Sequence, residues 1–285
     1  MHITTPNSYL STDRGFLTCE SKDIERKSIA IDDIRALIVE THGVSFSNNS
    51  LAKLMENDCA ILHCNNSYQP VGWTMPLDRI IRKEAFEKQI TAPEKFNNEL
   101  WKKIAKQKVL NQAQNLDLLE IEHDLYRLIN KPLISEANIA KQYWSHYFFS
   151  LSEPMNREHF NAKTFENSAL NYGYAIVSTL IYRSLLIHGL LPNLGIHHKG
   201  KYRSVPLVYD AMEPFRAFID LILFKFANDK PYEFEEEDFK SWTKYLSENL
   251  RICRLKHKKQ SYKLMDIIDI YIESLVNCYE KNESK

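Results

Sequence analysis

Two histidines and two acids lie close together in the sequence between residues 195 and 215. His197 and His198 precede Asp210 and Glu213 by twelve to sixteen residues, a span in which a loop can fold imidazoles back onto carboxylates. The two acids are three residues apart where the chain is predicted to become helical, and this spacing places side chains on one helical face. Carboxylates beside an imidazole are ligands of divalent metal ions. These four residues are therefore a candidate metal site.

A third carboxylate, Glu136, lies in the first turn of another predicted helix. Ser135 is a favourable N-cap for that helix, and an acid in the first turn complements the helix dipole, so Glu136 also has a purely structural explanation. Glu136, His198 and Glu213 together would supply two carboxylates and one imidazole from three elements. Such a set suits Mg²⁺ or Mn²⁺ and phosphodiester chemistry, in which the ion polarises a phosphoryl oxygen. The spacing alone leaves both explanations open.

The elements that must position these residues divide the chain into a β-rich and an α-rich part. Residues 1–78 contain short apolar runs and a hairpin around Arg14 and Gly15. Residues 79–94 are predicted to be a linker helix, and residues 95–285 a mainly helical domain. The predicted fold class is therefore α+β.

Most of the second part has helical periodicity. A long helix is predicted from Pro93 onward, with Trp101, Ile104 and Lys108 on one side, followed by a poorly ordered segment at residues 115–130. Further helices are predicted at residues 167–188, 215–226 and 264–279. Gly189 is predicted to end the first of these.

Composition and charge exclude several classes of protein. The chain has 37 basic and 37 acidic residues, so its overall charge does not indicate a nucleic-acid partner. Five cysteines without a CxxC pair argue against a disulfide framework or a structural zinc site. No signal pattern and no apolar run of about 20 residues is present. These features predict a cytoplasmic protein that does not enter a membrane.

Local basic clusters nevertheless accompany the candidate site. Near the histidines lie Lys199, Lys201 and Arg203. A second basic run contains Arg251, Arg254, Lys256, Lys258 and Lys259. Such runs are often solvated surface, but beside a metal site they would bind phosphates of a nucleic acid.

Three motifs together resemble one family in order and spacing. They are SEANIAKQYW at residues 135–144, LNYGY at 170–174, and GIHH at 195–198 followed by YDAMEPFR at 209–216. They are similar to CRISPR-associated protein one, the integrase/endonuclease family of spacer acquisition, and most like members from type II systems. The N-terminal YLS and GFL segments at residues 9–11 and 15–17 are similar to the family's β-domain.

This resemblance implies an N-terminal β-sandwich-like domain for dimerisation and partner contact, followed by a helical catalytic domain. It implies a homodimer, a complex with CRISPR-associated protein two, and the type II RNA-guided nuclease as a further partner candidate. The implied substrates are double-stranded DNA with 3′ overhangs and CRISPR repeat DNA. Each 3′-hydroxyl would attack a phosphodiester of the repeat.

The resemblance also assigns residues. It implies that Glu136, His198 and Glu213 are the catalytic metal ligands for Mg²⁺ or Mn²⁺, with His197 as the alternative histidine. Asp210 would bind metal or cap its helix, and Tyr172 would line the DNA path. Two other functions use the same residues: a non-catalytic DNA-binding scaffold, and a stand-alone metal nuclease acting on branched DNA.

Overall fold

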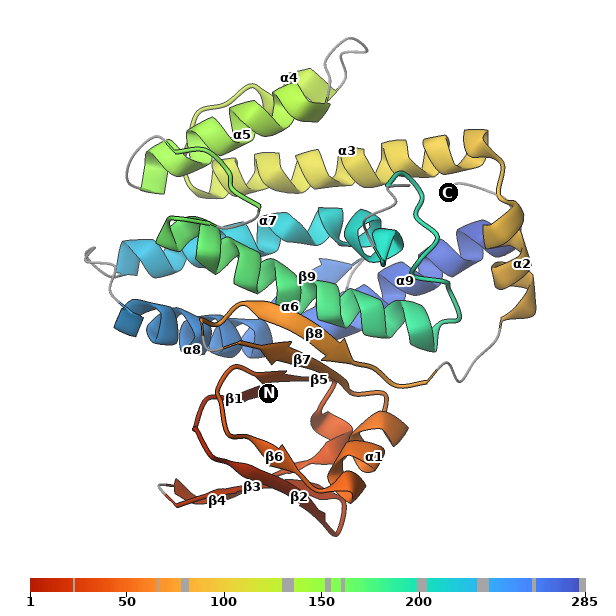
Figure 1. The fold of residues 1–285 in the computed structure, drawn as a ribbon. Helices are drawn as coiled ribbons and strands as arrows, with labels where there is room; N and C mark the ends of the chain where they lie inside the picture. The colour runs from red at the N-terminus through yellow and green to blue at the C-terminus, as the bar shows by residue number, and fades with distance from the viewer. Residues whose placement is uncertain are drawn as a thin grey trace. The chain divides into compact units, whose positions relative to one another are not determined.

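The computed structural model describes residues 1–22, 24–65, 67–77, 82–129, 136–151, 155–159, 162–198, 204–229, 236–257 and 260–281. The fold is α+β, as predicted, with most strands in the N-terminal part and most helices after it (Figure 1). Contacts divide the chain into two compact units. The first contains Met1–Thr91, Ser178–Pro192 and Cys253–Lys281, and the second contains Ala92–Val177 and Asn193–Ile252. The predicted domains are consecutive in sequence, whereas these units are assembled from separate stretches.

Two four-stranded sheets begin the first unit. The first sheet has the order β1 (His2–Ile3), β5 (Ala36–Val39), β7 (Ala60–Cys64) and β8 (Pro70–Thr74). The second has the order β4 (Ile24–Ala30), β3 (Phe16–Ser21), β2 (Tyr9–Asp13) and β6 (Ser45–Phe46). Leu37 and Ile61 of the first sheet share a buried core with Leu10 and Leu17 of the second. The N-terminal part is therefore β-sandwich-like, as expected.

Local sequence explains the connections within this sandwich. The β2–β3 hairpin turns through Arg14 and Gly15, whose φ angles of 46° and 85° are the positive values that a two-residue hairpin turn requires. The short 3-10 helix η1 (Ile31–Asp33) and helix α1 (Asn48–Glu56) follow. Ser47 caps α1, because its hydroxyl accepts the backbone N–H of Ser50 at 3.1 Å.

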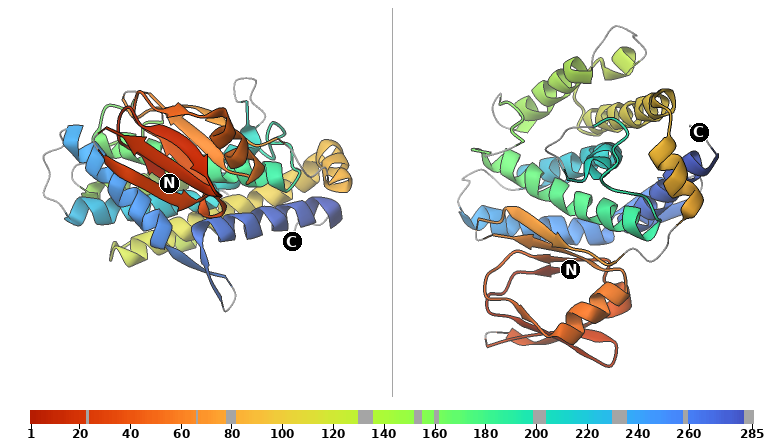
Figure 2. Two further views of the ribbon diagram at one scale, coloured as in Figure 1. Left: turned by 90° about the horizontal axis from the view of Figure 1, so that it is seen from below. Right: turned by 45° about the vertical axis from the view of Figure 1, so that its right-hand side comes forward.

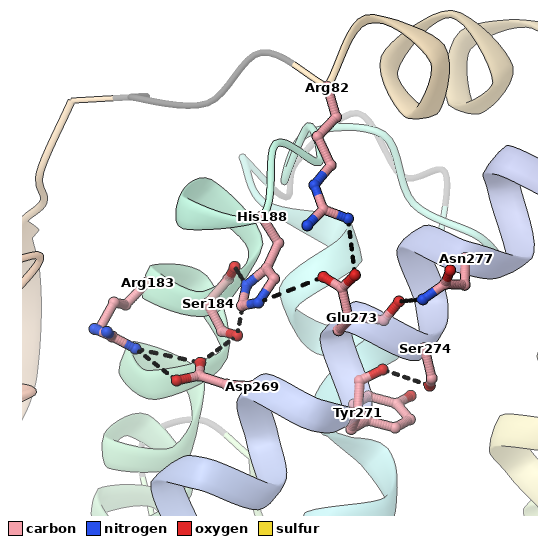
Figure 3. A network of polar contacts seen from close by, with 9 residues as sticks. All are labelled: Arg82, Arg183, Ser184, His188, Asp269, Tyr271, Glu273, Ser274 and Asn277. Carbon is pink, nitrogen blue, oxygen red and sulfur yellow. Dashed lines mark hydrogen bonds and ion pairs between the residues drawn. The ribbon is translucent and has the colours of Figure 1, made fainter.

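Polar contacts join the helices that complete the first unit. These elements are α2 (Lys83–Thr91), the second half of α6 (Phe165–Ile187) and α9 (Leu264–Lys281). Asp269 on α9 accepts the Ser184 hydroxyl of α6 at 2.6 Å, and Glu273 pairs with Arg82 at 2.9 Å (Figure 3). Gly189 has a φ of 78° and follows the end of α6, as predicted.

The second unit contains α3 (Glu94–Leu118), α4 (Leu125–Ile129), α5 (Glu136–Leu151), the first half of α6, α7 (Pro206–Asp229) and α8 (Glu236–Ile252). Helices α3 and α7 lie side by side (Figure 1). Asn111 Nδ2 donates to the Pro214 carbonyl at 2.7 Å, and Asn115 Nδ2 donates to the Ala217 carbonyl. The order of these contacts shows that the two helices run in the same direction.

One prediction about the helical part was wrong, and one element in it was not predicted. Residues 115–129 are not poorly ordered, because α3 continues to Leu118 and α4 follows, while Asn130 lies outside the described residues. The buried contact of Asn115 with α7 extends α3, a tertiary effect that propensity does not include. Arg254 and Lys256 of the basic run lie in β9 (Arg254–His257), which pairs with β10 (Gln260–Lys263) in an unpredicted hairpin that leads into α9 (Figure 2). Among the described residues, no helix is long and apolar enough to cross a membrane.

Candidate active site

The Asp210 carboxylate organises the loop that precedes α7. Asp210 is fully buried, and its Oδ2 accepts the backbone N–H groups of Ile196 at 2.7 Å and His197 at 2.9 Å. Its Oδ1 contacts Nδ1 of His198. Gly195 allows this close fold, since a Cβ at that position would lie 2.3 Å from the His198 carbonyl oxygen. Asp210 therefore holds the loop backbone and orients an imidazole.

The two adjacent histidines have different surroundings. The Nδ1 of His198 faces Asp210, and 32% of its side chain is exposed. A carboxylate on one ring nitrogen is the usual way of orienting the other nitrogen toward a metal ion. The His197 ring instead stacks on Trp101 of α3, with 4.3 Å between ring centroids and an interplanar angle of 5°. This difference favours His198 over His197 as a metal ligand.

Glu213 is held between two cations inside the second unit. Its Oε2 lies 2.7 Å from Lys108 Nζ on α3, and its Oε1 accepts a hydrogen bond from Arg216 Nε at 2.8 Å. Burial by itself would raise the pKa of this carboxyl, but the charges and hydrogen bonds of Arg216 and Lys108 lower the pKa to about 2. Glu213 is consequently ionised at every physiological pH.

A histidine and a second arginine, His159 and Arg157, also lie near Glu213. Burial lowers the pKa of His159 to about 4, assisted by the charges of Arg157 and Arg216. Arg157 donates to the side chain of Asn167 at 3.0 Å and lies over the Tyr174 ring. The surroundings of Glu213 are thus positive, with His159 neutral near pH 7.

A buried network connects α7 to α5 and α6. The Asp220 carboxylate accepts the hydroxyls of Tyr143 on α5, at 2.7 Å, and of Tyr174 on α6. Tyr147 on α5 donates to the Asp220 carbonyl at 2.8 Å. Burial raises the pKa of Asp220 to about 6. This network fastens α5, the helix that begins at Glu136, against α7.

The structure brings together some of the predicted residues. His198, Asp210 and Glu213 lie on one loop and helix of the second unit, and Glu136 is the first residue of α5 in the same unit. The Glu136 side chain lies outside the described part of the structure. Within the part that is described, no group of three His, Cys, Asp or Glu side chains forms a metal site. The ligand set remains a prediction.

Other predicted residues have different outcomes. Tyr172 is buried and packs against the ring of Phe239, so in this structure it belongs to the helix packing. Arg251 at the end of α8 and Arg254 in β9 are exposed. Lys199, Lys201, Arg203, Lys258 and Lys259 lie outside the described residues, as does the side chain of Lys256.

The sequence predictions missed several groups around Glu213. Lys108 was placed on the buried side of its helix but not connected with Glu213, and Arg216 stands three residues after Glu213 on the same helix face. The signal for Lys108 in the sequence was its helical spacing from Trp101 and Ile104, which places it on the same side of α3 as these two residues. No local signal indicated Arg157 or Asp220.

Comparison with known protein families identifies the family of this chain. Residues 1–260 match the family model described as CRISPR associated protein Cas1. The chain belongs to the Cas1 family. The CRISPR-associated endonuclease Cas1 of Neisseria meningitidis serogroup C (strain 8013) is 31% identical over 205 residues, covering 69% of this chain and 66% of that relative. The match thus spans slightly less than two thirds of the relative's length.

Solved structures support the same fold. The chain is similar to a casposase bound to integration product, with a TM-score of 0.85, 16% identity, and coverage of 100% of this chain and 91% of the other. It is also similar to a chain of a Cas6-RT-Cas1–Cas2 complex, with a TM-score of 0.77, 15% identity, and coverage of 100% and 35% respectively. At these identities the similarity concerns the fold alone.

Proposed function

We propose that this Cas1-family chain is a metal-dependent DNA integrase/endonuclease of CRISPR adaptation, which joins the 3′-hydroxyl ends of a short DNA to the CRISPR repeat. The observation that carries the proposal is a buried, ionised Glu213 in the same helix as Asp210, whose carboxylate orients His198. The relative from Neisseria is named an endonuclease, and a casposase bound to integration product shares the fold. Both names support DNA strand chemistry.

The residues fit a hard divalent ion such as Mg²⁺ or Mn²⁺. Glu213 is ionised, and His198 has one ring nitrogen on a carboxylate, as metal-ligating histidines do. Glu136, His198 and Glu213 would hold the ion. When bound, the ion would polarise the scissile phosphate and lower the pKa of the attacking hydroxyl.

The chain's own residues would orient the imidazole and bind the DNA. Asp210 would keep the His198 ring in one tautomer and orientation, because its carboxylate accepts the Nδ1 proton. Arg157 and Arg216 would hold a positive field for the anionic strand. The predicted DNA contacts at the basic runs, including Arg251 and Arg254, would bind the backbone of the duplex.

We further propose that the protein acts in the cytoplasm as a homodimer together with the Cas2 protein. The similar chain in a Cas6-RT-Cas1–Cas2 complex supports a Cas2 partner. Double-stranded DNA with 3′ overhangs and CRISPR repeat DNA would be the substrates. The type II RNA-guided nuclease is a further candidate partner.

A joining assay tests this function. A labelled duplex with 3′-hydroxyl ends is incubated with a repeat-containing plasmid, Cas2 and Mn²⁺, using wild-type protein and the variants Glu136→Gln, His198→Ala and Glu213→Gln. Each variant should reduce joining by at least about a hundredfold, because each removes a ligand of the ion. The variant Lys106→Met, on the exposed side of α3, is the matched control. Normal joining by the three ligand variants would refute the assignment.

The products distinguish the alternatives. A stand-alone nuclease on branched DNA, which the relative's name endonuclease also supports, would yield hydrolysed ends in place of joined strands. A non-catalytic scaffold would bind DNA with a steep salt dependence but yield neither product. A His197→Ala variant that fails while His198→Ala joins normally would move the ligand role to His197.

A further inference from the structure

One face of the His197 imidazole is stacked on the Trp101 indole of α3. The two rings are parallel, with 4.3 Å between their centroids and an interplanar angle of 5°. Trp101 is only 9% exposed, whereas His197 is an exposed residue of the loop before α7. Because the indole covers one face of the imidazole, the ring can meet another molecule through its opposite face and its outer edge.

The nitrogens of the His197 ring do not hold it in place. Within the described part of the chain, this imidazole makes no hydrogen bond or ion pair, and its contacts with other rings are those with Trp101 and His198. A metal-ligating histidine normally has its second ring nitrogen on a carboxylate or carbonyl, as His198 has on Asp210. His197 therefore presents a flat ring and not an oriented nitrogen.

The stacked ring is fixed from two sides. The His197 backbone N–H donates to the buried Asp210 carboxylate at 2.9 Å, which sets the position of the loop. Trp101 belongs to α3, and Asn111 and Asn115 of the same helix hold α3 against α7. A ring that is already immobilised loses little conformational freedom when a second flat molecule stacks on it. The His197 ring is thus a preorganised surface for stacking.

This surface adjoins the candidate metal site. The His197 and His198 rings meet edge to face, with 5.2 Å between centroids and an interplanar angle of 81°. A DNA strand whose 3′-hydroxyl reaches an ion at His198 and Glu213 brings the base of the same nucleotide beside these two imidazoles. In the proposed substrate this base lies in a 3′ overhang and has no pairing partner. Proteins bind unpaired bases by stacking them on aromatic side chains, histidine included.

We propose that His197, supported by Trp101, is the platform on which the unpaired base at the 3′ end of the DNA strand stacks. Stacking there positions the terminal nucleotide, so that its hydroxyl lies at the candidate metal site. Every base has a π face, so the platform accepts all four bases. This inference rests on the proposed function, and it gives His197 a role distinct from that of an alternative metal ligand.

Binding of a DNA duplex with 3′ overhangs, measured by fluorescence anisotropy in EDTA and without repeat DNA, tests the platform. The terminal nucleotide carries either its base or an abasic analogue, and the proteins are wild type, His197→Ala, His197→Phe and His42→Ala. Loss of the terminal base should weaken binding to wild type at least about fivefold, the lower end of what one stacked base contributes. The same loss should change binding to His197→Ala by less than about twofold, because the stacking partner is already gone.

Two variants separate stacking from other roles of the histidine. His197→Phe keeps a flat ring against Trp101 without ring nitrogens and should retain the dependence on the terminal base. His42→Ala removes an exposed histidine of the first unit and should behave as wild type. An abasic analogue within the duplex is the matched DNA control, since it should act equally on all four proteins. Equal sensitivity of wild type and His197→Ala to the terminal base would overturn the inference.

A second measurement uses the unmodified protein and so does not depend on a variant that folds. The terminal base is replaced by 5-iodouracil, which on irradiation forms a bond to an aromatic side chain that stacks on it, and the modified residue is located by mass spectrometry. The cross-link should lie on His197. A cross-link that lies only on another residue, such as Tyr172, would place the terminal base elsewhere and contradict the platform.

The outcomes separate this inference from the proposed function. If the dependence on the terminal base requires His197 but no strand is joined with Mn²⁺, Cas2 and repeat DNA, the platform stands and the integrase function is wrong. If wild type and His197→Ala join strands equally well and bind base-bearing and abasic ends alike, the function stands and the platform is wrong. If His197→Phe loses the base dependence as His197→Ala does, the ring nitrogens carry the contact and stacking is wrong.

Discussion

Replacement of Asp210 by alanine should destabilise the second unit, because it removes the hydrogen bonds that the carboxylate accepts from the preceding loop. The Asp210 carboxylate is fully buried and accepts the backbone N–H groups of Ile196 and His197 at 2.7 and 2.9 Å. Ile196 is buried, so its N–H would be left without an acceptor, and an unsatisfied buried donor costs about 1–3 kcal/mol, whereas the N–H of the exposed His197 can bond to water. Asp210→Ala should therefore lower the free energy of unfolding by about 1–3 kcal/mol, a substantial part of the roughly 5–15 kcal/mol typical of a domain.

Urea unfolding followed by circular dichroism and tryptophan fluorescence measures this loss. Trp101 stacks on His197, so its emission reports on the loop that Asp210 holds. Asp210→Asn is the matched variant, because it keeps the side-chain volume and one acceptor oxygen and should cost clearly less. It should still weaken Mn²⁺ binding by about 10–100-fold, since the orientation of His198 is lost. A loss clearly below about 1 kcal/mol for Asp210→Ala would refute the reasoning from the buried N–H of Ile196.

Three further predictions follow from buried groups. Burial raises the pKa of Asp220 to about 6. The Asp220 carboxyl therefore binds its proton more tightly in the folded protein than in the unfolded chain. The stability that the protonated carboxyl contributes is present below about pH 4 and is lost as the pH rises through 6. Wild type should lose up to about 3 kcal/mol relative to Asp220→Asn between pH 4 and 7 in urea unfolding, and a gain over this range would contradict the assignment. Gly173→Ala should destabilise by about 1–3 kcal/mol in the same assay, because its Cβ would lie 2.4 Å from Ile219 Cγ2, whereas Gly72→Ala, with open space around the site, should cost little. Burial raises the pKa of the Cys59 thiol to about 12, so Cys59 should resist iodoacetamide at pH 8 in native protein and react after unfolding; rapid native labelling detected by mass spectrometry would show that the thiol is accessible.

Local sequence signals predicted the elements that local geometry controls. The positive φ angles at Arg14 and Gly15, the glycine after α6 and the helical stripe of α3 all arise from residues that are neighbours in the chain. The spacing of Asp210 and Glu213 also predicted correctly that both lie in one helix. It did not predict their different tasks, because Asp210 binds the preceding loop and Glu213 binds a lysine of α3.

Resemblance of the motifs identified the family before any geometry was known. The family assignment is confirmed by the match over residues 1–260. The assignment of Glu136, His198 and Glu213 as metal ligands remains a prediction. Their side chains come from three different elements, and a metal-bound structure would test whether they meet.

The sequence by itself therefore determined the fold class, the principal helices and strands, the family and the choice of candidate residues. Only the tertiary structure decided which groups surround each candidate. It placed Lys108 on Glu213 across 105 positions of sequence, oriented His198 through Asp210, and buried Asp220 between helices α5 and α6. The physical reason is that backbone preferences act between neighbours in the chain, whereas charge pairing and burial depend on which helices pack together.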